Sequence, residues 1–289
     1  MSLTRTLAVL RIVHGSAALL LLLEMLPLWK QWLQPEVLRL PYASWYPTLP
    51  RDALPVLLTW WILSALAFLA GWATRWTGSV LAVVLGYVLF LDQQFYSNHH
   101  LLLVVNVVYL VLANGGAEWS IDARRLSPKQ RAATPARANP WAARLLQTQL
   151  TAVYLFAGLS KLNPTFLSGA VLAVYLPREG FLAWPEAWRT QEVLQPLAGA
   201  TVLGELALAV GLWLRGLRRL AMIGGGMLHL SMFALLDRSQ LLGILSFVLT
   251  CLSIYLLWLT PEPDADASQR PQTPSLHDHP AQQADQLRA

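Results

Sequence analysis

The chain has 289 residues, of which 55% are hydrophobic and only 13% are Asp, Glu, Lys or Arg, and its mean hydropathy is +0.45. Soluble domains carry about 25% charged residues, so this composition excludes an ordinary water-soluble domain, because too few charges are present to cover its surface. The net charge of +5 does not indicate a nucleic-acid partner, because the basic residues are scattered over the segments between apolar runs.

Apolar segments of membrane-spanning length dominate the chain. A helix needs about 20 mostly apolar residues to cross the hydrocarbon layer of a bilayer. We therefore predict an all-α integral membrane protein with about eight transmembrane helices. In chain order, the predicted spans lie near residues 7–27, 54–73, 76–93, 99–115, 142–162, 196–215, 217–237 and 240–260.

Two segments differ from the spans. Residues 164–194 contain three prolines among aromatic side chains, which favours an interfacial or re-entrant segment over a full span. Residues 261–289 are rich in Pro, Gln, Asp and Ser and offer almost nothing to bury, so we predict a disordered cytoplasmic tail after a transmembrane domain of residues 1–260. Cys251 is the single cysteine and lies in an apolar run, which excludes an intramolecular disulfide.

The basic residues between the spans set the expected orientation, because loops rich in Lys and Arg stay in the cytoplasm. With the N-terminus inside, the inner loops hold ten basic residues and the outer loops six. The inner ones are Arg5, Arg75, Arg124, Arg125, Lys129, Arg131, Arg137, Arg215, Arg218 and Arg219; the outer ones are Lys30, Arg39, Arg51, Arg178, Arg189 and Arg238. We expect a protein of the bacterial inner membrane with both termini in the cytoplasm.

Polar residues interrupt the spans mostly in the halves that this orientation places outside. An ionisable residue inside a span costs about 2.5–3.5 kcal/mol on insertion scales, so it is retained for pairing or for function. The outer set is Glu24, Asp92, Asn98, His99, His100, Lys161 and His229. Arg11 and Glu205 lie deeper or nearer the inner half, and we expect Arg11 to pair with a carboxylate such as Glu205.

Each of these residues has a structural and a chemical interpretation. Lys161 is either a lysine whose ammonium reaches the headgroups or a base buried beside a cavity. His99 and His100 either begin a helix that is capped by Ser97 or Asn98, or take part in the chemistry of a functional site. Adjacent histidines point to different helix faces, so no metal site is predicted. His229 either donates an interhelical hydrogen bond or supports a site.

Several segments, taken in order, resemble a known family. They are L-A-V-L-R-I at 7–12, F-Y-S-N-H-H-L-L-L at 95–103, A-N-G-G-A-E-W-S-I-D-A at 113–123, Q-L-T-A-V-Y-L-F-A-G-L-S-K-L-N-P-T-F-L-S-G at 149–169, M-L-H-L-S-M-F-A-L-L at 227–236 and G-I-L-S-F-V-L at 243–249. Their order resembles the horizontally transferred transmembrane (HTTM) domain, the membrane part of vitamin K-dependent γ-carboxylase. The resemblance covers residues 7–257.

The resemblance implies a role for each matching residue. The family lysine, which corresponds to Lys161, deprotonates vitamin K hydroquinone, and oxygen converts that species to an epoxide through a strong base that allows carboxylation of a peptidyl glutamate. Asn98 and His99 match the family Asn-His pair and are expected to polarise the substrate. The expected substrate-binding residues are His100, His229 and Tyr154.

The sequence also departs from the carboxylase. Ser160 stands where the family has a second lysine, Phe166 stands in place of a tryptophan, and Ser168 replaces an acid. The large lumenal domain that grips the substrate protein has no counterpart here, so the hydroquinone half of the chemistry is expected to survive more easily than carboxylation.

These observations favour a membrane protein that binds a vitamin K-like hydroquinone, another quinol or another lipophilic substrate. Lys161 would be its general base. The expected partners are membrane lipids and a membrane or exported protein. Two alternatives stay open: a non-catalytic scaffold, maturation or immunity factor, and a transporter, although the internal repeat typical of transporters is not evident.

Overall fold

The computed structural model describes residues 1–34, 36–48, 50–127, 129–130, 138–176, 184–235 and 241–261. The secondary structure of these residues is helical, without a β-strand. The helices are α1 (Leu3–Trp32), η1 (Arg51–Ala53), α2 (Leu54–Ala70), α3 (Thr74–Leu91), η2 (Gln93–Phe95), α4 (Asn98–Leu112), α5 (Ile121–Arg125), α7 (Pro140–Ser160), α8 (Pro164–Leu167), α9 (Ala170–Tyr175), η3 (Glu186–Trp188), α10 (Gln191–Gly211), α11 (Arg218–Leu235), α12 (Leu241–Ile254) and α13 (Leu256–Leu259).

Each predicted apolar segment coincides with a helix, which confirms an all-helical membrane fold. Five helical stretches of the described chain are long and apolar enough to cross a membrane: α1, α2 with η1, α3, α10, and α12 with α13. α4 is a shorter apolar helix. The count of eight crossings therefore stays a prediction. Within 164–194 the structure has two short helices, a 3₁₀ turn and the start of α10 rather than a continuous span; residues 177–183 and the predicted tail from 262 lie outside the described part.

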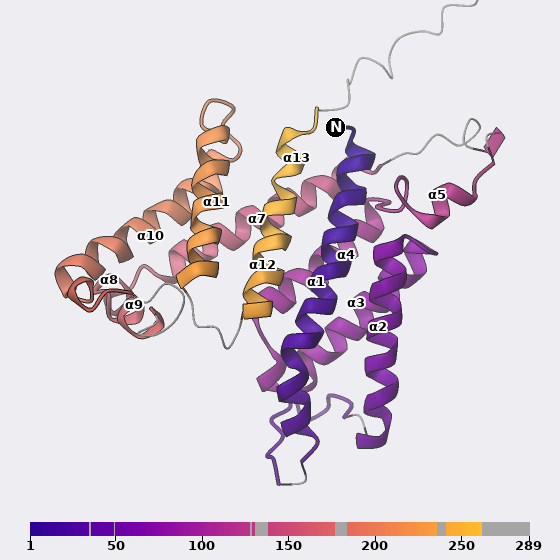
Figure 1. Cartoon of the computed structure of the whole chain (residues 1–289), viewed down its shortest axis with the longest axis horizontal. Coiled ribbons are helices and arrows are strands. Elements are labelled where there is room, and N and C mark those ends of the chain that lie inside the picture. Colours follow the sequence, from indigo (N-terminus) through magenta and orange to yellow (C-terminus); the bar gives the residue numbers. More distant parts are fainter. Residues whose placement is uncertain are drawn as a thin grey trace, which may run out of the picture.

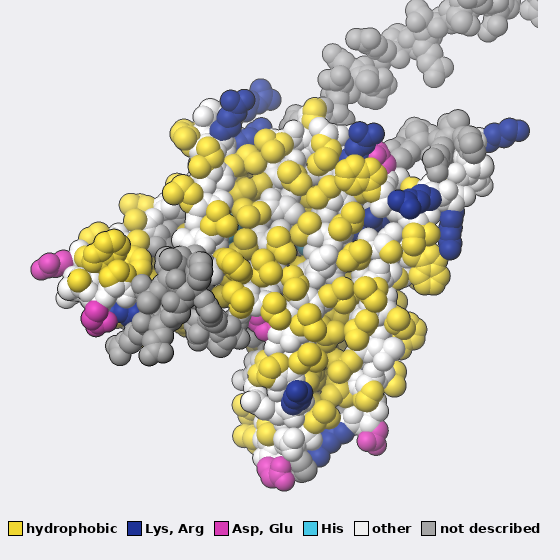
Figure 2. All heavy atoms as spheres, viewed as in Figure 1, with side chains coloured by type: hydrophobic (Ala, Val, Ile, Leu, Met, Phe, Trp, Pro, Cys, Tyr) yellow, Lys and Arg dark blue, Asp and Glu magenta, His cyan; other side chains and the backbone are white. Residues whose placement is uncertain are grey.

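The first helix lies at the centre of the bundle and packs against α2, α4 and α12 (Figure 1). α3 covers α2 and α4, while α7 pairs with α10, which in turn contacts α11. In Figure 1, α8 and α9 lie at the far end of α10, away from α2 and α3. Figure 2 shows hydrophobic side chains over most of the body of the bundle, as a lipid-facing surface requires.

Helix ends follow local sequence signals. Ser97 has an extended backbone and its hydroxyl accepts the N–H of His100, so the predicted cap at the start of α4 is confirmed for Ser97. Between α2 and α3, Gly71 has a φ of 71°, and the N–H of Trp72 donates to Ala67 O at 2.9 Å. A left-handed residue of this kind ends a helix most easily when it is glycine.

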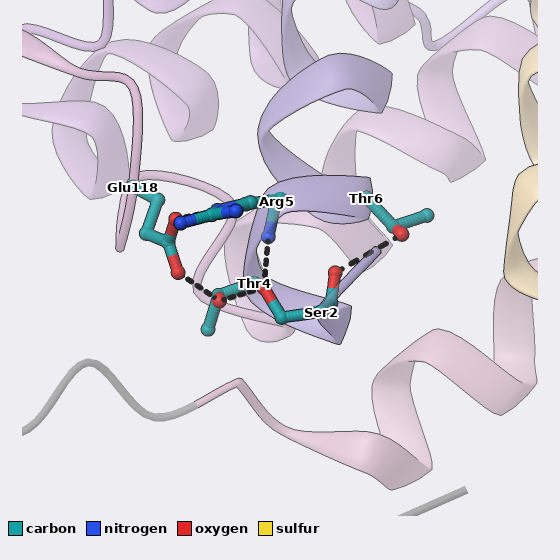
Figure 3. A network of polar contacts seen from close by, with 5 residues as sticks. All are labelled: Ser2, Thr4, Arg5, Thr6 and Glu118. Atoms are coloured by element: carbon teal, nitrogen blue, oxygen red, sulfur yellow. Dashed lines mark hydrogen bonds and ion pairs between the residues drawn. The ribbon is translucent and has the colours of Figure 1, made fainter. Parts of the chain in front are cut away.

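The start of α1 is attached to the segment that follows α4 (Figure 3). Arg5 Nε donates to a Glu118 carboxylate oxygen at 3.0 Å, and the Thr4 hydroxyl donates to the other oxygen. Ser2 caps the helix by accepting the Arg5 N–H and also contacts the Thr4 hydroxyl. The Arg5–Glu118 pair is largely exposed, so it contributes little by itself.

Asp122 attaches the same segment to the start of α3. Its carboxylate accepts the N–H groups of Ala73 and Thr74, at 2.7 and 2.8 Å, and the Thr74 hydroxyl at 2.9 Å. The fully buried Arg11 lies in the same region: its Nη2 donates to Trp119 O at 2.7 Å, and Asp122 is the carboxylate that interacts with its charge. The expected pairing of Arg11 with Glu205 is therefore wrong, because the packing of α1 brings Arg11 to the 113–125 segment instead of α10.

Candidate functional site

Lys161 forms an ion pair with Glu205. It follows the last residue of α7, and its Nζ lies 2.6 and 2.8 Å from the two carboxylate oxygens of Glu205 on α10. The glutamate side chain is only 8% exposed, whereas that of the lysine is 27% exposed, so the pair lies at the edge of the protein interior. The Nζ also lies 5.8 Å from the centre of the Phe166 ring, so the phenylalanine at this position supplies an aromatic face to the cation.

Close packing of α7 on α10 brings the two charges together. A Cβ on Gly158 would lie 2.9 Å from the Leu206 side chain, so the absence of a side chain lets the two helices approach. Glu205 precedes Leu206 and therefore faces the last turn of α7. Its carboxylate is also within electrostatic range of the hydroxyl of Tyr154, one turn earlier on α7 than Gly158.

Tyr154 is the centre of a buried hydrogen-bonded chain. Its hydroxyl lies 2.7 Å from His229 Nε2 on α11 and 2.6 Å from the hydroxyl of Tyr255, between α12 and α13. All three side chains are buried. One consistent assignment has Tyr255 donating to Tyr154 and Tyr154 donating to His229, which leaves His229 Nδ1 as a buried N–H without an acceptor among the described residues. We call Lys161, Glu205, Tyr154, His229 and Tyr255 the lysine–tyrosine site.

A mostly apolar groove lies between α10 and α11, the helices that carry Glu205 and His229, but the five residues of the lysine–tyrosine site are not among those that line it. Its volume is about 660 Å³. Leu208 and Leu228 line it, and Leu228 is the neighbour of His229 in the chain. Small residues such as Gly204 and Gly224 widen it. An apolar space of this size can take a small lipophilic molecule.

The other predicted residues form a separate histidine cluster at the start of α4. His99 Nε2 lies 3.1 Å from the Ser97 hydroxyl and 3.9 Å from a Glu24 carboxylate oxygen. Glu24 also accepts the N–H of Gly243 at the start of α12. His100 is fully buried, with Nδ1 near Phe95 O and its ring against Trp61. Asn98 is exposed, and the Tyr96 hydroxyl is its hydrogen-bond partner.

The structure thus brings together only part of the expected site. Tyr154 and His229 contact each other. Lys161 binds Glu205, whose carboxylate interacts electrostatically with the Tyr154 hydroxyl. The hydrogen bonds and ion pairs of the described residues do not connect Asn98, His99 or His100 to Lys161. Sequence reasoning missed Tyr255, whose only signal was a polar hydroxyl within the apolar run 241–260.

The arrangement can hold and move protons. A carboxylate bound to an ammonium can accept a proton from a third group, and a tyrosine–histidine chain can orient or share one. In the described part of the chain, no three His, Cys, Asp or Glu side chains are grouped as metal ligands.

Fold and site together define an all-helical membrane protein in which a lysine–glutamate pair and a tyrosine–histidine chain join α7, α10, α11 and α12. The family model of the HTTM domain matches residues 4–262, so the chain belongs to the HTTM domain family, which confirms the resemblance seen in the sequence. No solved structure matches the chain.

Proposed function

We propose that this HTTM protein binds a quinol-like or other lipophilic substrate at the lysine–tyrosine site and removes a proton from its hydroxyl group. The observation that carries the proposal is the Lys161–Glu205 ion pair, formed by the lysine that the sequence resemblance matches to the carboxylase lysine. An ion pair at the edge of an apolar interior is costly to maintain for stability alone, since desolvation offsets most of its attraction.

The pair can act as one base. A proton passes from the Lys161 ammonium to the Glu205 carboxylate, which leaves a neutral amine. That amine then takes the proton of the substrate hydroxyl. The products are a substrate oxyanion, a Lys161 ammonium and a protonated Glu205, so charge and protons balance, and the ammonium remains beside the oxyanion to stabilise it.

The neighbouring groups suit a flat, lipophilic phenol. The buried Nδ1–H of His229 can donate to a substrate oxygen, and the groove between α10 and α11 can take an apolar ring or side chain. A lipid-soluble substrate can enter this groove from the membrane. Asn98, His99 and His100 stay predictions, because their cluster lies on other helices.

The test compares Lys161→Arg with Lys161→Ala in the purified full chain. The assay follows oxidation of a naphthohydroquinone by dissolved oxygen, with thermal unfolding in detergent as the folding control. Arginine keeps the charge and can pair with Glu205, but it does not release a proton near neutral pH. We expect Lys161→Arg to fold like the wild type and to lose at least about a hundredfold in rate, the usual scale of general-base catalysis. Ser160→Ala, a change at the exposed neighbouring residue, should keep full activity.

The rival function, a non-catalytic scaffold, makes the opposite prediction. If the ion pair only fastens α7 to α10, Lys161→Arg should keep both stability and function, whereas Lys161→Ala should lose stability. Wild-type turnover by Lys161→Arg would therefore refute the base and leave the scaffold.

The wider setting belongs to the same proposal. We infer an inner-membrane protein with both termini in the cytoplasm, because the basic residues gather mostly at the end of the bundle where α1 begins (Figure 2). Carboxylation of a membrane or exported protein would follow only if such a partner supplies its own means of docking.

A further inference from the structure

A row of aromatic rings leads from the lysine–tyrosine site to the turn between α10 and α11, at the end of the bundle where α1 begins (Figure 1). The hydroxyls of Tyr154 and Tyr255 lie 2.6 Å apart. The centres of the Tyr255 and Trp258 rings are 6.4 Å apart, and those of the Trp258 and Trp213 rings are 5.7 Å apart. Trp213 is 38% exposed, whereas the other three side chains are buried. We call these four residues the aromatic relay.

The spacing within the aromatic relay suits the transfer of single electrons. Tyrosine and tryptophan side chains can lose one electron and regain it. The rate of electron transfer falls steeply with distance, so a series of short steps between neighbouring rings is faster than one long step. The steps here are a hydrogen bond and two edge-to-face ring pairs, with interplanar angles of 77° and 79°. The relay therefore offers a continuous route from buried Tyr154 to exposed Trp213.

His229 supplies the base that oxidation of Tyr154 requires. A phenol that loses an electron becomes a strong acid, and its positive charge is costly in an apolar interior unless the proton leaves. His229 Nε2 lies 2.7 Å from the Tyr154 hydroxyl and accepts its proton in the donor order given above. The Glu205 carboxylate is in electrostatic range of the same hydroxyl and favours positive charge beside it.

A second pair of tyrosines lacks such a base. The rings of Tyr46 and Tyr87 are stacked, with their centres 5.6 Å apart. Both hydroxyls donate to backbone carbonyl oxygens, that of Tyr46 to Tyr87 O at 3.0 Å and that of Tyr87 to Pro47 O at 2.9 Å. A carbonyl oxygen accepts a hydrogen bond but is too weak a base to take the proton. The histidine, and not the proximity of the rings, therefore distinguishes the aromatic relay.

We propose that the aromatic relay carries an electron from Trp213 to the lysine–tyrosine site, and that His229 takes and returns the phenolic proton of Tyr154. This use rests on the proposed function, because a quinol in contact with dissolved oxygen gives oxygen-centred radicals as by-products. Such a radical takes one electron from Tyr154 and becomes an anion. The phenolic proton passes to His229 Nε2, so a neutral tyrosyl radical and an imidazolium remain.

The second step restores the tyrosine. An electron from Trp213 passes through Trp258 and Tyr255 to the tyrosyl radical, and the proton returns from the imidazolium. A soluble thiol then reduces oxidised Trp213, loses its proton to water and becomes a thiyl radical. The Arg144 guanidinium, 5.8 Å from the centre of the Trp213 ring, disfavours positive charge on that ring, so the oxidised form rests at the tyrosine until the thiol arrives. The thiol thus reduces the radical in the site, and the side chains of the relay are unchanged.

The test uses the purified full-length protein in detergent without a quinol, so that its result is independent of the proposed base. Photo-excited ruthenium tris-bipyridine with a soluble quencher oxidises exposed aromatic residues by one electron. Electron paramagnetic resonance identifies the radical, and its absorption gives the rate of formation. We expect a tyrosyl radical that forms more slowly in heavy water than in ordinary water, because a proton moves with the electron. Lys161→Arg, which should lose the proposed base, should form this radical like the wild type.

Variants locate the radical and its route, with thermal unfolding as the folding control. Tyr154→Phe should abolish the tyrosyl signal. His229→Gln keeps a hydrogen-bond acceptor but removes the base, and should slow formation about a hundredfold, the scale of proton transfer to a positioned side chain. Trp258→Phe keeps an aromatic ring that is not readily oxidised, and should remove most of the signal. Tyr46→Phe, a change in the tyrosine pair without a base, should leave the signal intact.

Other outcomes overturn the proposal. An unchanged signal in Trp258→Phe would show that the electron takes another route. An equal loss in Tyr46→Phe would show that the radical is not specific to the aromatic relay. A wild-type protein that forms only a tryptophanyl radical, or that forms its tyrosyl radical equally fast in both solvents, would refute the role of His229, and this measurement decides alone if Tyr154→Phe fails to fold.

Discussion

Three consecutive glycines on α11 have different surroundings, and this difference yields a sharp test of the lysine–tyrosine site. A Cβ on Gly225 would lie 1.9 Å from the Tyr255 hydroxyl oxygen and 3.2 Å from the Leu208 side chain. A Cβ on Gly226 would meet nothing within 4 Å. We therefore predict opposite effects for Gly225→Ala and Gly226→Ala.

The magnitudes follow from the contacts. Alanine in place of glycine inside a helix stabilises by about 0.8–1.0 kcal/mol, and Gly226→Ala should gain about this amount. Gly225→Ala gains the same term, but overpacking costs about 1–3 kcal/mol and the lost Tyr154–Tyr255 hydrogen bond about 0.5–1.5 kcal/mol. The two variants should therefore differ by about 1.5–4.5 kcal/mol in the free energy of unfolding.

Thermal unfolding of both variants in the same detergent measures this difference. For a chain of this size, 1 kcal/mol corresponds to about 2 °C in the unfolding temperature, so Gly225→Ala should unfold roughly 3–9 °C below Gly226→Ala. Equal unfolding temperatures would refute the placement of the Tyr255 hydroxyl against α11, and with it the chain from Tyr255 to His229.

Two further pairs of substitutions test other polar contacts by the same assay. Tyr154→Phe leaves both His229 and Tyr255 without a buried partner and should cost about 1–3 kcal/mol more than Tyr255→Phe, which keeps the contact with His229; equal losses would contradict the central place of Tyr154. Asp122→Ala removes the acceptor of three hydrogen bonds at the start of α3 and should cost about 3 kcal/mol, whereas Glu118→Ala should cost less than about 1 kcal/mol; a reversed order would show that Asp122 does not hold this junction.

The helices were predictable because membrane insertion depends on local properties. A run such as 54–73 is mostly apolar, and the helix that forms within it, α2, follows from the need to satisfy backbone groups without water. The end of α2 at Gly71 and the start of α4 at Ser97 also follow from single residues. By contrast, the apolar segment 240–260 is divided into α12 and α13 at Tyr255, and no proline or glycine at this position predicts the division.

The partners of the buried charges were not predictable, because they depend on which helices pack together. Arg11 and Glu205 carry opposite charges and were expected at similar depths in the membrane. The local sequence does not distinguish this pairing from that of Lys161 with Glu205. Only the close contact of α7 and α10 at Gly158 decides between them. For the same reason His99 and His229 were expected to bind one substrate, although they belong to different helix contacts.

The packing of α1 against α12 has a consequence for how the protein is made. Ser246 on α12 donates to Ala17 O on α1, and the N–H of Gly243 donates to Glu24. The first apolar segment to leave the ribosome thus obtains its principal neighbour only when nearly the whole chain has been synthesised. Arg11 obtains its partners earlier, when residues 113–125 follow α4, and until that point this buried charge must be tolerated by lipid or shielded by the insertion machinery. The contact between the two ends of the transmembrane domain can therefore form only after the intervening helices have been synthesised.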